Sequence, residues 1–259
     1  MGTDVYGAGF YASQRRASKR SAAVLVPLLM ALVEPASVVD VGCGVGAWLQ
    51  RFAEEGVSEI LGLDGPWVDR GLLEVPAECF VAMDLSRPDG LPHRFDLATC
   101  LEVAEHIPRA AAPGLVALLC QAAPAVCFGA AIPGQGGAEH LNEQWPGYWS
   151  DLFSDQGYRM LDVIRPRVWE DSGIEPWSAQ NTFLYVAEER LTDGRLLRSA
   201  LRLANETRMP LRVVHPELFR RFVSLEYVSS GRMLRELIRR AGLRLVGKRR
   251  TRPSPDHAG

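Results

Sequence analysis

Lysine is nearly absent from this chain of 259 residues: Lys19 and Lys248 are the only two, and arginine supplies the rest of the 29 basic residues. No run approaches the ~20 apolar residues that a membrane-spanning helix needs, so we expect no membrane span. The cysteines form no CxxC pair, and the sequence contains no internal repeat. A zinc site built on cysteine pairs and a repeat architecture are therefore not indicated.

The five cysteines lie along apolar runs, at positions 43, 79, 100, 120 and 127. This placement is typical of buried free thiols in a reducing compartment, so we expect a cytoplasmic protein. Basic residues before an apolar run at 15–36 imitate a secretory signal. About fourteen residues precede the first basic pair, however, and Pro27 interrupts the run. We predict an amphipathic helix here, packed on the first strand.

The net charge of -2 hides an asymmetry. From Glu188 to the end there are seventeen basic and eight acidic residues, about +9, which leaves about -11 for residues 1–187. A basic tail can indicate an anionic partner. Because lysine is so scarce, the arginine content reflects in part a general habit of the genome, and we do not expect a nucleic-acid partner.

Short β-rich runs alternate with helical stretches from Ser37 onward. Strands separated by helices of this length imply βαβ crossovers and a mainly parallel sheet. The last two strands have no clear helix between them, so one is expected to pair antiparallel at an edge. The expected strands are 37–42, 59–65, 78–84, 95–103, 125–132, 158–169 and 181–189, and the expected helices are 45–55, 67–74, 109–123 and 145–157.

Three segments follow from this pattern. Residues 1–36 form an N-terminal lid and helix, 37–189 form the main α/β domain, and 190–259 form a basic, helical C-terminal appendage. In the appendage one helical face is apolar, and Gly242 can stop that helix; the face consists of Met233, Leu234, Leu237, Ile238 and Ala241. The predicted fold is a Rossmann-like, doubly wound, seven-stranded and mostly parallel sheet with an antiparallel edge strand.

The most specific motif is VVDVGCGVGAWL at 38–49, where an apolar strand ends in Asp40 and Gly42, Gly44 and Gly46 alternate before a helix. Glycines let the backbone turn sharply and approach a ligand closely. The helix start that follows offers free N–H groups and a positive dipole end. The run also fits a dinucleotide fingerprint, so the loop alone does not identify the cofactor.

Acidic residues end the next strands. Asp64 ends the second, where doubly wound sheets place an acid that binds ribose hydroxyls. Asp84 and Leu85 end the third, where they can meet an adenine amino group and ring face. The fourth strand reads FDLATCLEVAEHIP, with Glu102 at its carboxyl end and Glu105-His106 opening the next loop.

Taken together, these four motifs resemble the class I S-adenosylmethionine-dependent methyltransferases in order and spacing, over roughly residues 20–189. The resemblance implies S-adenosylmethionine as cofactor and S-adenosylhomocysteine as product. It places Asp40, Gly42 and Gly44 along the methionine portion. The remaining residues that it implies are Asp64 on the ribose diol with Gly65 and Trp67 nearby, Asp84 and Leu85 at adenine, Leu101 and Glu102 beside the sulfonium, and Tyr11, with Tyr6, in a lid over the cofactor.

A narrower resemblance involves LGLDGPWVDRGLL, LEVAEHIP, AAIPGQGGAEHLNEQWPGYW and QNTFLYV. These segments look like a bacterial methyltransferase group associated with glycan and natural-product biosynthesis. Val45 stands where the usual variant of the glycine loop has threonine or serine, a change that backbone-mediated contacts tolerate.

The loops after the fourth and fifth strands face one crevice, because ligands in such sheets lie beyond the carboxyl ends of the strands. Histidine suits a general base for a hydroxyl, since its unperturbed pKa is ~6.5. We predict His140 as that base and His106 as the second candidate. Glu139 or Glu143 would orient it, and Asn142 would bind the acceptor, on a lid hinged by the glycines at 134–137.

Structural alternatives stay open at these positions. His106 could satisfy the turn before Pro108, and His140 could be a residue at a helix start beside an Asn142 cap. A metal site of the two histidines and a glutamate has no supporting ligand spacing, and none is predicted. Trp145, Tyr148 and Trp149 share a helical face that suits core packing first and an acceptor pocket wall second.

The sequence therefore predicts a methyltransferase acting on a small-molecule acceptor, a hydroxyl of a sugar or glycosylated natural product. An N-methyltransferase on an amino sugar or amine metabolite is the first alternative. An RNA methyltransferase docking through the arginine-rich tail, a non-catalytic cofactor-binding partner and an NAD-dependent oxidoreductase are the others. An oligomer is possible.

Overall fold

The computed structural model describes residues 8–88, 90–91, 93–191 and 209–223, and within these ranges the side chains from Arg15 to Arg221. The chain divides into two compact units, Met1–Leu218 and Phe219–Gly259. The second unit is described only over the end of helix α8 (Pro216–Val223). The helix predicted around 233–241 and most of the basic appendage lie outside the described residues. The predicted segment boundaries at 36 and 189 stay predictions.

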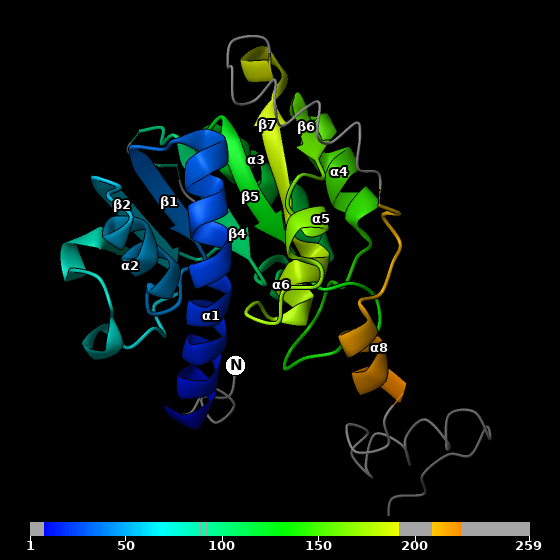
Figure 1. Ribbon diagram of the computed structural model, residues 1–259. Coiled ribbons are helices and arrows are strands. Elements are labelled where there is room, and N and C mark those ends of the chain that lie inside the picture. The colour runs from blue at the N-terminus through cyan, green and yellow to red at the C-terminus, as the bar shows by residue number, and fades with distance from the viewer. Residues whose placement is uncertain (1–7, 89, 92, 192–208, 224–259) are drawn as a thin grey trace, which may run out of the picture. The chain divides into compact units, whose positions relative to one another are not determined.

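The first unit is built on a seven-stranded sheet in the order β3-β2-β1-β4-β5-β7-β6 (Figure 1). Neighbouring strands from β3 to β5 pair in parallel, whereas β7 pairs antiparallel with both β5 and β6. The predicted antiparallel pairing at the edge is thus confirmed, and β7, second from the edge, is the reversed strand. The strands are β1 (Ser37–Val41), β2 (Glu59–Asp64), β3 (Phe80–Ala82), β4 (Leu97–Leu101), β5 (Ala125–Gly129), β6 (Tyr158–Leu161) and β7 (Phe183–Ala187).

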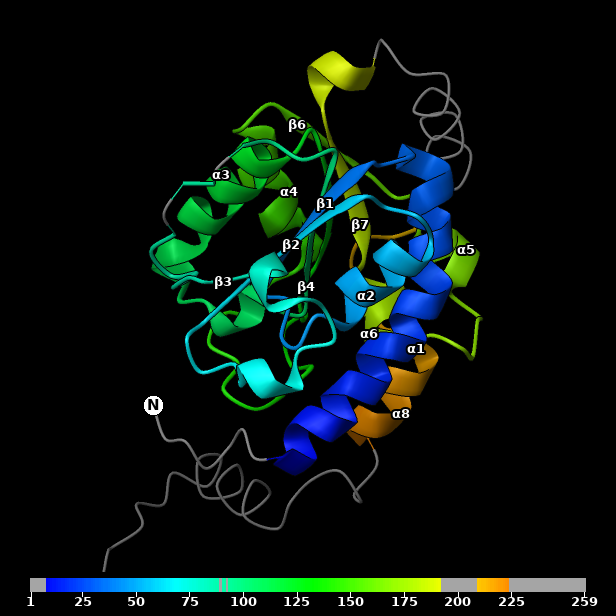
Figure 2. The same ribbon diagram turned by 90° about the vertical axis from the view of Figure 1, so that its left-hand side faces the viewer.

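Helices cover both faces of the sheet. On one face lie α1 (Ala8–Val33), α2 (Ala47–Glu54), α5 (Arg165–Val168) and α6 (Pro176–Asn181), and on the other lie α3 (Ala112–Ala122) and α4 (Pro146–Ser154) (Figure 2). Short 3-10 turns complete the described elements: η1 (Arg70–Leu72), η2 (Ala77–Cys79), η3 (Ala104–His106), η4 (Arg109–Ala111) and η5 (Glu188–Leu191).

Two apolar cores result from the alternation of side chains along each strand. In β5, Cys127 points into the core beneath α1 and α2, and its neighbour Phe128 points into the core beneath α3 and α4. The central strands β1, β4, β5 and β7 are buried on both faces, as a sheet with helices on each side requires. The rigid sheet fixes the positions of the loops at its carboxyl edge.

The predicted N-terminal helix is present as α1, and Pro27 lies inside it. An interior proline removes a backbone hydrogen bond and costs about 3 kcal/mol. Leu25, Val26 and Leu29 around it are fully buried, and each such side chain contributes about 1.5–3 kcal/mol. Burial of this helix face therefore offsets the proline. Among the described residues, no helix is long and apolar enough to cross a membrane.

Two predicted elements are wrong. Residues 67–74 form only the turn η1, because Gly71 weakens a helix and this turn buries no side chain in the core. The strand predicted over 158–169 ends at Leu161, and Pro166, which cannot donate to a strand ladder, lies in the first turn of α5. Two short helices, α5 and α6, consequently separate the last two strands, where no helix was expected.

Candidate active site

The glycine loop joins β1 to α2 through three left-handed residues. Gly42, Gly44 and Gly46 have φ angles of 85°, 55° and 88°, a region that favours glycine. At Gly42 space is a second constraint, because an added Cβ would lie 2.2 Å from Cγ2 of Val103. The glycine loop therefore packs directly against the loop that follows β4.

A pocket lies over this loop. Its lining includes five of the predicted cofactor residues: Asp40, Gly42, Gly44, Leu101 and Glu102. Sequence reasoning did not assign the other lining residues, which come from α1, the glycine loop and the start of α2: Arg15, Ser18, Cys43, Val45, Ala47 and Trp48. Arg15 and Lys19 both pair with the buried Glu74, at 2.8 Å in the case of Lys19. The ion pair with Glu74 holds the guanidinium of Arg15 beside the pocket.

Two carboxylates anchor the ends of β1 and β2. Asp40 is buried and accepts a hydrogen bond of 2.6 Å from Thr99 Oγ1, while its Oδ2 has no partner among the described residues. Burial raises the pKa of Asp40 to about 7, with a further rise from Asp64 and an opposing effect of Thr99. Asp64 accepts from the amides of Gly44, at 2.7 Å, and Gly65, at 2.6 Å.

The predicted adenine and ribose residues lie outside the lining of this pocket. The indole of Trp67 lies over Gly65, where an added Cβ would approach the ring to 2.1 Å, and Trp67 is 60% exposed. Asp84 is exposed and accepts two hydrogen bonds from Ser86, which lower its pKa. Leu85 is buried. The side chain of Tyr11, and Tyr6 altogether, lie outside the described residues.

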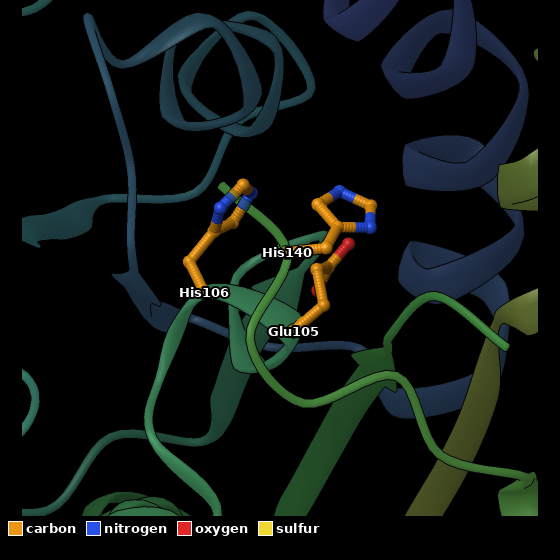
Figure 3. A group of neighbouring side chains, drawn as sticks. All are labelled: Glu105, His106 and His140. Atoms are coloured by element: carbon orange, nitrogen blue, oxygen red, sulfur yellow. The ribbon is translucent and has the colours of Figure 1, made fainter. Parts of the chain in front are cut away.

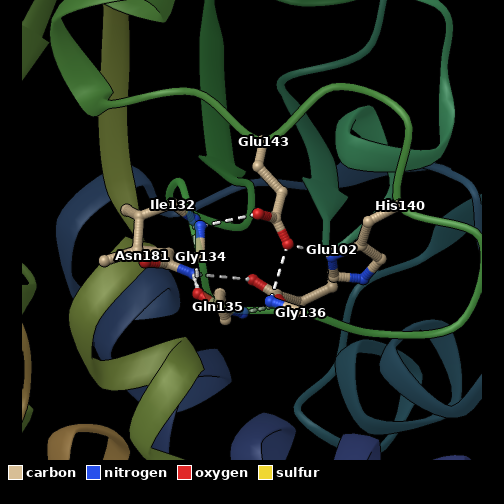
Figure 4. Close-up of polar contacts among 8 residues, drawn as sticks. All are labelled: Glu102, Ile132, Gly134, Gln135, Gly136, His140, Glu143 and Asn181. Atoms are coloured by element: carbon tan, nitrogen blue, oxygen red, sulfur yellow. Dashed lines mark hydrogen bonds and ion pairs between the residues drawn. The ribbon is translucent and has the colours of Figure 1, made fainter. Parts of the chain in front are cut away.

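Glu102 follows β4 in a left-handed conformation with a φ of 57°, which is unusual for a side chain of this size. Its carboxylate accepts from Gln135 Nε2 and from Asn181 Nδ2, both at 3.2 Å (Figure 4). Asn181 also donates to Gln135 Oε1 at 3.0 Å. Burial raises the pKa of Glu102, against these hydrogen bonds. The network links the ends of β4 and α6 to the glycine-rich segment after β5.

The segment that carries His140 is anchored by Glu143. The carboxylate of Glu143 accepts from the amides of Gly134 and Gly136, each at 2.7 Å, and lies 2.9 Å from His140 Nδ1 (Figure 4). With Nδ1 paired to a carboxylate, the Nε2 atom of His140 is left as the acceptor nitrogen. The predicted orienting role of Glu143 thus has a matching contact, whereas Glu139 is exposed.

The two histidines predicted to share one crevice lie together. Their ring centroids are 4.9 Å apart and nearly perpendicular, with Glu105 beside them (Figure 3). The backbone carbonyl of Glu105 accepts from the amides of Leu141, at 2.7 Å, and Asn142, at 2.9 Å. Burial lowers the pKa of His106, and the neighbouring His140 lowers it further. The turn η3 and the His140 segment are therefore joined through the backbone.

Asn142 does not cap α4. The residue at the N-cap position is Trp145, and no side chain caps this helix. Asn142 is buried, and its Oδ1 accepts from Gln144 Nε2 at 3.0 Å. Trp149 is buried against Phe128, with ring centroids 5.0 Å apart. For Trp149 the core interpretation is confirmed, and for His140 the alternative of a helix start beside an asparagine cap is wrong.

The sheet, the glycine loop and the pocket define a Rossmann-like nucleotide-binding fold. Residues 11–150 match the family model described as a methyltransferase domain. The match covers more than half of the chain, so the chain belongs to this family of methyltransferase domains.

A curated relative agrees in part of the chain. The ubiquinone biosynthesis O-methyltransferase of Neisseria meningitidis serogroup C is 32% identical over 85 residues, which cover 29% of this chain and 35% of that protein. The chain thus matches about a third of that relative's length.

Solved structures share the fold. CalS10, an amino pentose methyltransferase from Micromonospora echinaspora involved in calicheamicin biosynthesis, aligns with a TM-score of 0.52 and 17% identity, over 72% of this chain and 100% of that chain. TnmH aligns with a TM-score of 0.51 and 20% identity, over 72% of this chain and 59% of that chain. At this level of identity both support the architecture alone.

Proposed function

We propose that this chain is an S-adenosylmethionine-dependent methyltransferase acting on a small-molecule acceptor. The observation that carries the proposal is the pocket over the glycine loop, with Arg15 and Asp40 both in its lining. A guanidinium and a carboxyl group suit the carboxylate and ammonium of a methionine moiety. The free amides at the start of α2 and the carboxylate of Asp64 would serve the polar remainder of the cofactor.

Methyl transfer from a sulfonium is an in-line displacement. The acceptor's lone pair forms the new bond to the methyl carbon, and the electrons of the carbon–sulfur bond return to sulfur as a neutral thioether. Leu101 and Glu102 line the pocket and would lie beside the sulfonium. Because the positive charge disappears during the reaction, alignment and proton removal are the contributions left to the protein.

We assign proton removal to the histidine pair, with His140 as the general base and His106 as the second candidate. Glu143 accepts from Nδ1 of His140 and would fix the tautomer whose Nε2 takes the acceptor's proton. Asn142 Nδ2 has no hydrogen-bond partner among the described residues, and we assign it to acceptor binding.

For the acceptor, we propose a hydroxyl of a sugar or glycosylated natural product. The name of the Neisseria relative specifies O-methylation, and that of CalS10 an amino pentose. An amine acceptor is the second candidate, because a protonated amine must also lose a proton before it attacks. The cytoplasmic setting is supported by the free cysteines, all of them buried or partly buried. The oligomeric state stays a prediction.

Calorimetry with S-adenosylhomocysteine and with NAD tests the cofactor. We expect binding of S-adenosylhomocysteine alone, and failure to bind it would refute the proposal. His140→Ala should keep that affinity and lower turnover on the acceptor by about 10²–10⁴-fold, the usual contribution of a general base. Unchanged turnover would move proton removal to His106 or leave alignment as the sole contribution.

A further inference from the structure

Glu105, His106 and His140 bring together three potential metal ligands. One ligand atom from each lies within 4.8 Å of the other two (Figure 3). In a tetrahedral site with ligands at about 2.1 Å the ligand atoms are about 3.4 Å apart. Each pair therefore needs to approach by no more than about 1.4 Å, which side-chain rotation can provide.

Burial supplies an independent observation. Glu105 is fully buried and its carboxyl lies beside that of Glu102, yet neither of its oxygens makes a hydrogen bond of normal geometry in the described part of the chain. The Nδ1 atom of His106 is buried without a partner as well. Buried polar atoms are nearly always paired, because an unpaired one costs several kcal/mol in desolvation. A cation between them would satisfy the carboxylate and the imidazole together.

The contacts of His140 are those of a histidine that binds a metal. A histidine that binds a metal usually directs its second nitrogen to a carboxylate, which fixes the ring. His140 does so through Nδ1 to Glu143, at 2.9 Å. Its Nε2 lies over Gly137, where an added Cβ would approach that nitrogen to 2.2 Å. The absence of a side chain at residue 137 thus leaves the space for the ring.

We propose that Glu105, His106 and His140 bind a divalent transition-metal ion. Two imidazoles and one carboxylate favour ions such as Zn²⁺, Fe²⁺ or Mn²⁺, whereas Mg²⁺ and Ca²⁺ prefer oxygen ligands. Three protein ligands leave at least one coordination position open. The proposal that the ion binds depends on the geometry and burial of these three side chains and does not depend on the proposed function.

The role of the ion in catalysis rests on the proposed function. A bound cation lowers the pKa of a hydroxyl at its open position. In the metal-loaded protein the Nε2 of His140 would be occupied, and the ion would lower the pKa of the acceptor hydroxyl so that its proton passes to solvent water. In the metal-free protein the same imidazole is the base. The site therefore implies two levels of turnover, the faster one dependent on metal.

Titration of the full chain with Zn²⁺ and with Mg²⁺ by calorimetry tests the site. We expect one equivalent of Zn²⁺ and no comparable binding of Mg²⁺. Glu105→Gln keeps the size of the buried side chain and should weaken Zn²⁺ binding at least 100-fold. His140→Gln serves the same purpose if Glu105→Gln does not fold. His93→Ala is the matched control, since His93 pairs with Glu59 at 2.8 Å on the exposed surface.

The absorption spectrum of the Co²⁺-loaded protein provides the second measurement. Nitrogen and oxygen ligands give d–d bands without the charge-transfer band of a thiolate. A thiolate band would assign the ion to a cysteine and overturn the proposal, as would wild-type affinity in Glu105→Gln, equal affinity for Mg²⁺, or no Zn²⁺ binding at all. Affinity for S-adenosylhomocysteine, measured on the same samples, reports separately on the proposed function.

Discussion

Asp64 at the end of β2 accepts a hydrogen bond from the amide of Gly44 at 2.7 Å, and so joins the glycine loop to the neighbouring strand. The second oxygen of the same carboxylate accepts from Gly65 at 2.6 Å. The carboxylate thus holds two loops in position before any ligand arrives. A cofactor that uses Asp64 would meet a group already fixed by two backbone amides.

Removal of this carboxylate should weaken cofactor binding. We expect Asp64→Ala to lower the affinity for S-adenosylhomocysteine by about 10–100-fold, since hydrogen bonds to charged groups contribute about 1.5–3 kcal/mol. Calorimetry measures the change. Asp69→Ala is the control, because Asp69 accepts from Gly71 in the exposed turn η1 and does not line the pocket. Equal losses in the two variants would contradict a specific role for Asp64.

Asp40 should make stability depend on pH. Its pKa is about 7 in the folded protein because the carboxyl is buried, above the ordinary value of about 3.9 in the unfolded chain. The folded state binds the proton of Asp40 more tightly, so the contribution of this group to stability is greatest below about pH 4 and falls as the pH rises from about 4 to about 7. Above that window the loss is constant.

Asp40→Asn removes this dependence. In urea denaturation without ligand, the variant should be more stable than wild type at pH 8 by about 2–4 kcal/mol, from roughly three pKa units at 1.36 kcal/mol each, and the difference should shrink at pH 5. Its affinity for S-adenosylhomocysteine should fall, because the charge facing the ammonium is lost. An identical advantage at both pH values would refute the explanation.

Glu143 should limit the local opening of the segment that carries His140. Its carboxylate accepts from two backbone amides and from His140, whereas Gln offers one acceptor oxygen. Glu143→Gln is expected to speed hydrogen exchange at Gly134 and Gly136 by about 10–100-fold, the effect of losing about 1.5–3 kcal/mol. Mass spectrometry of peptides over 130–144 measures it. Asp151→Asn, in an exposed part of α4, should leave exchange unchanged.

A substitution at Gly137 tests the placement of the His140 imidazole without changing the imidazole itself. Because a Cβ at this position would overlap Nε2 of His140, Gly137→Ala should displace the ring and weaken Zn²⁺ binding about 10-fold or more, with cofactor affinity retained. Gly147→Ala in α4 meets no atom within 4 Å, and should raise stability by about 0.4–1 kcal/mol. Similar Zn²⁺ affinities in the two variants would contradict the steric argument.

The sequence predicted those features that a short stretch encodes. The sheet and the pocket's glycine loop follow from local strand, turn and helix signals around Asp40 and Gly44. The contact between His106 and His140 followed from their positions after adjacent strands. Local patterns do not report partners distant in sequence, so Arg15 in the pocket and Asn181 on Glu102 were not found. The strand predicted beyond Leu161 ran through Pro166, a residue that lies in the first turn of α5 and is incompatible with a strand there.

The carbonyl of Glu105 accepts hydrogen bonds from the amides of both Leu141 and Asn142. These bonds have a consequence for the entropy of substrate binding. A lid that orders only when substrate arrives subtracts the free energy of its ordering from substrate affinity. Here two backbone bonds already join the His140 segment to the turn η3 that carries His106. The loss of backbone freedom has occurred during folding, so substrate binding need not supply it.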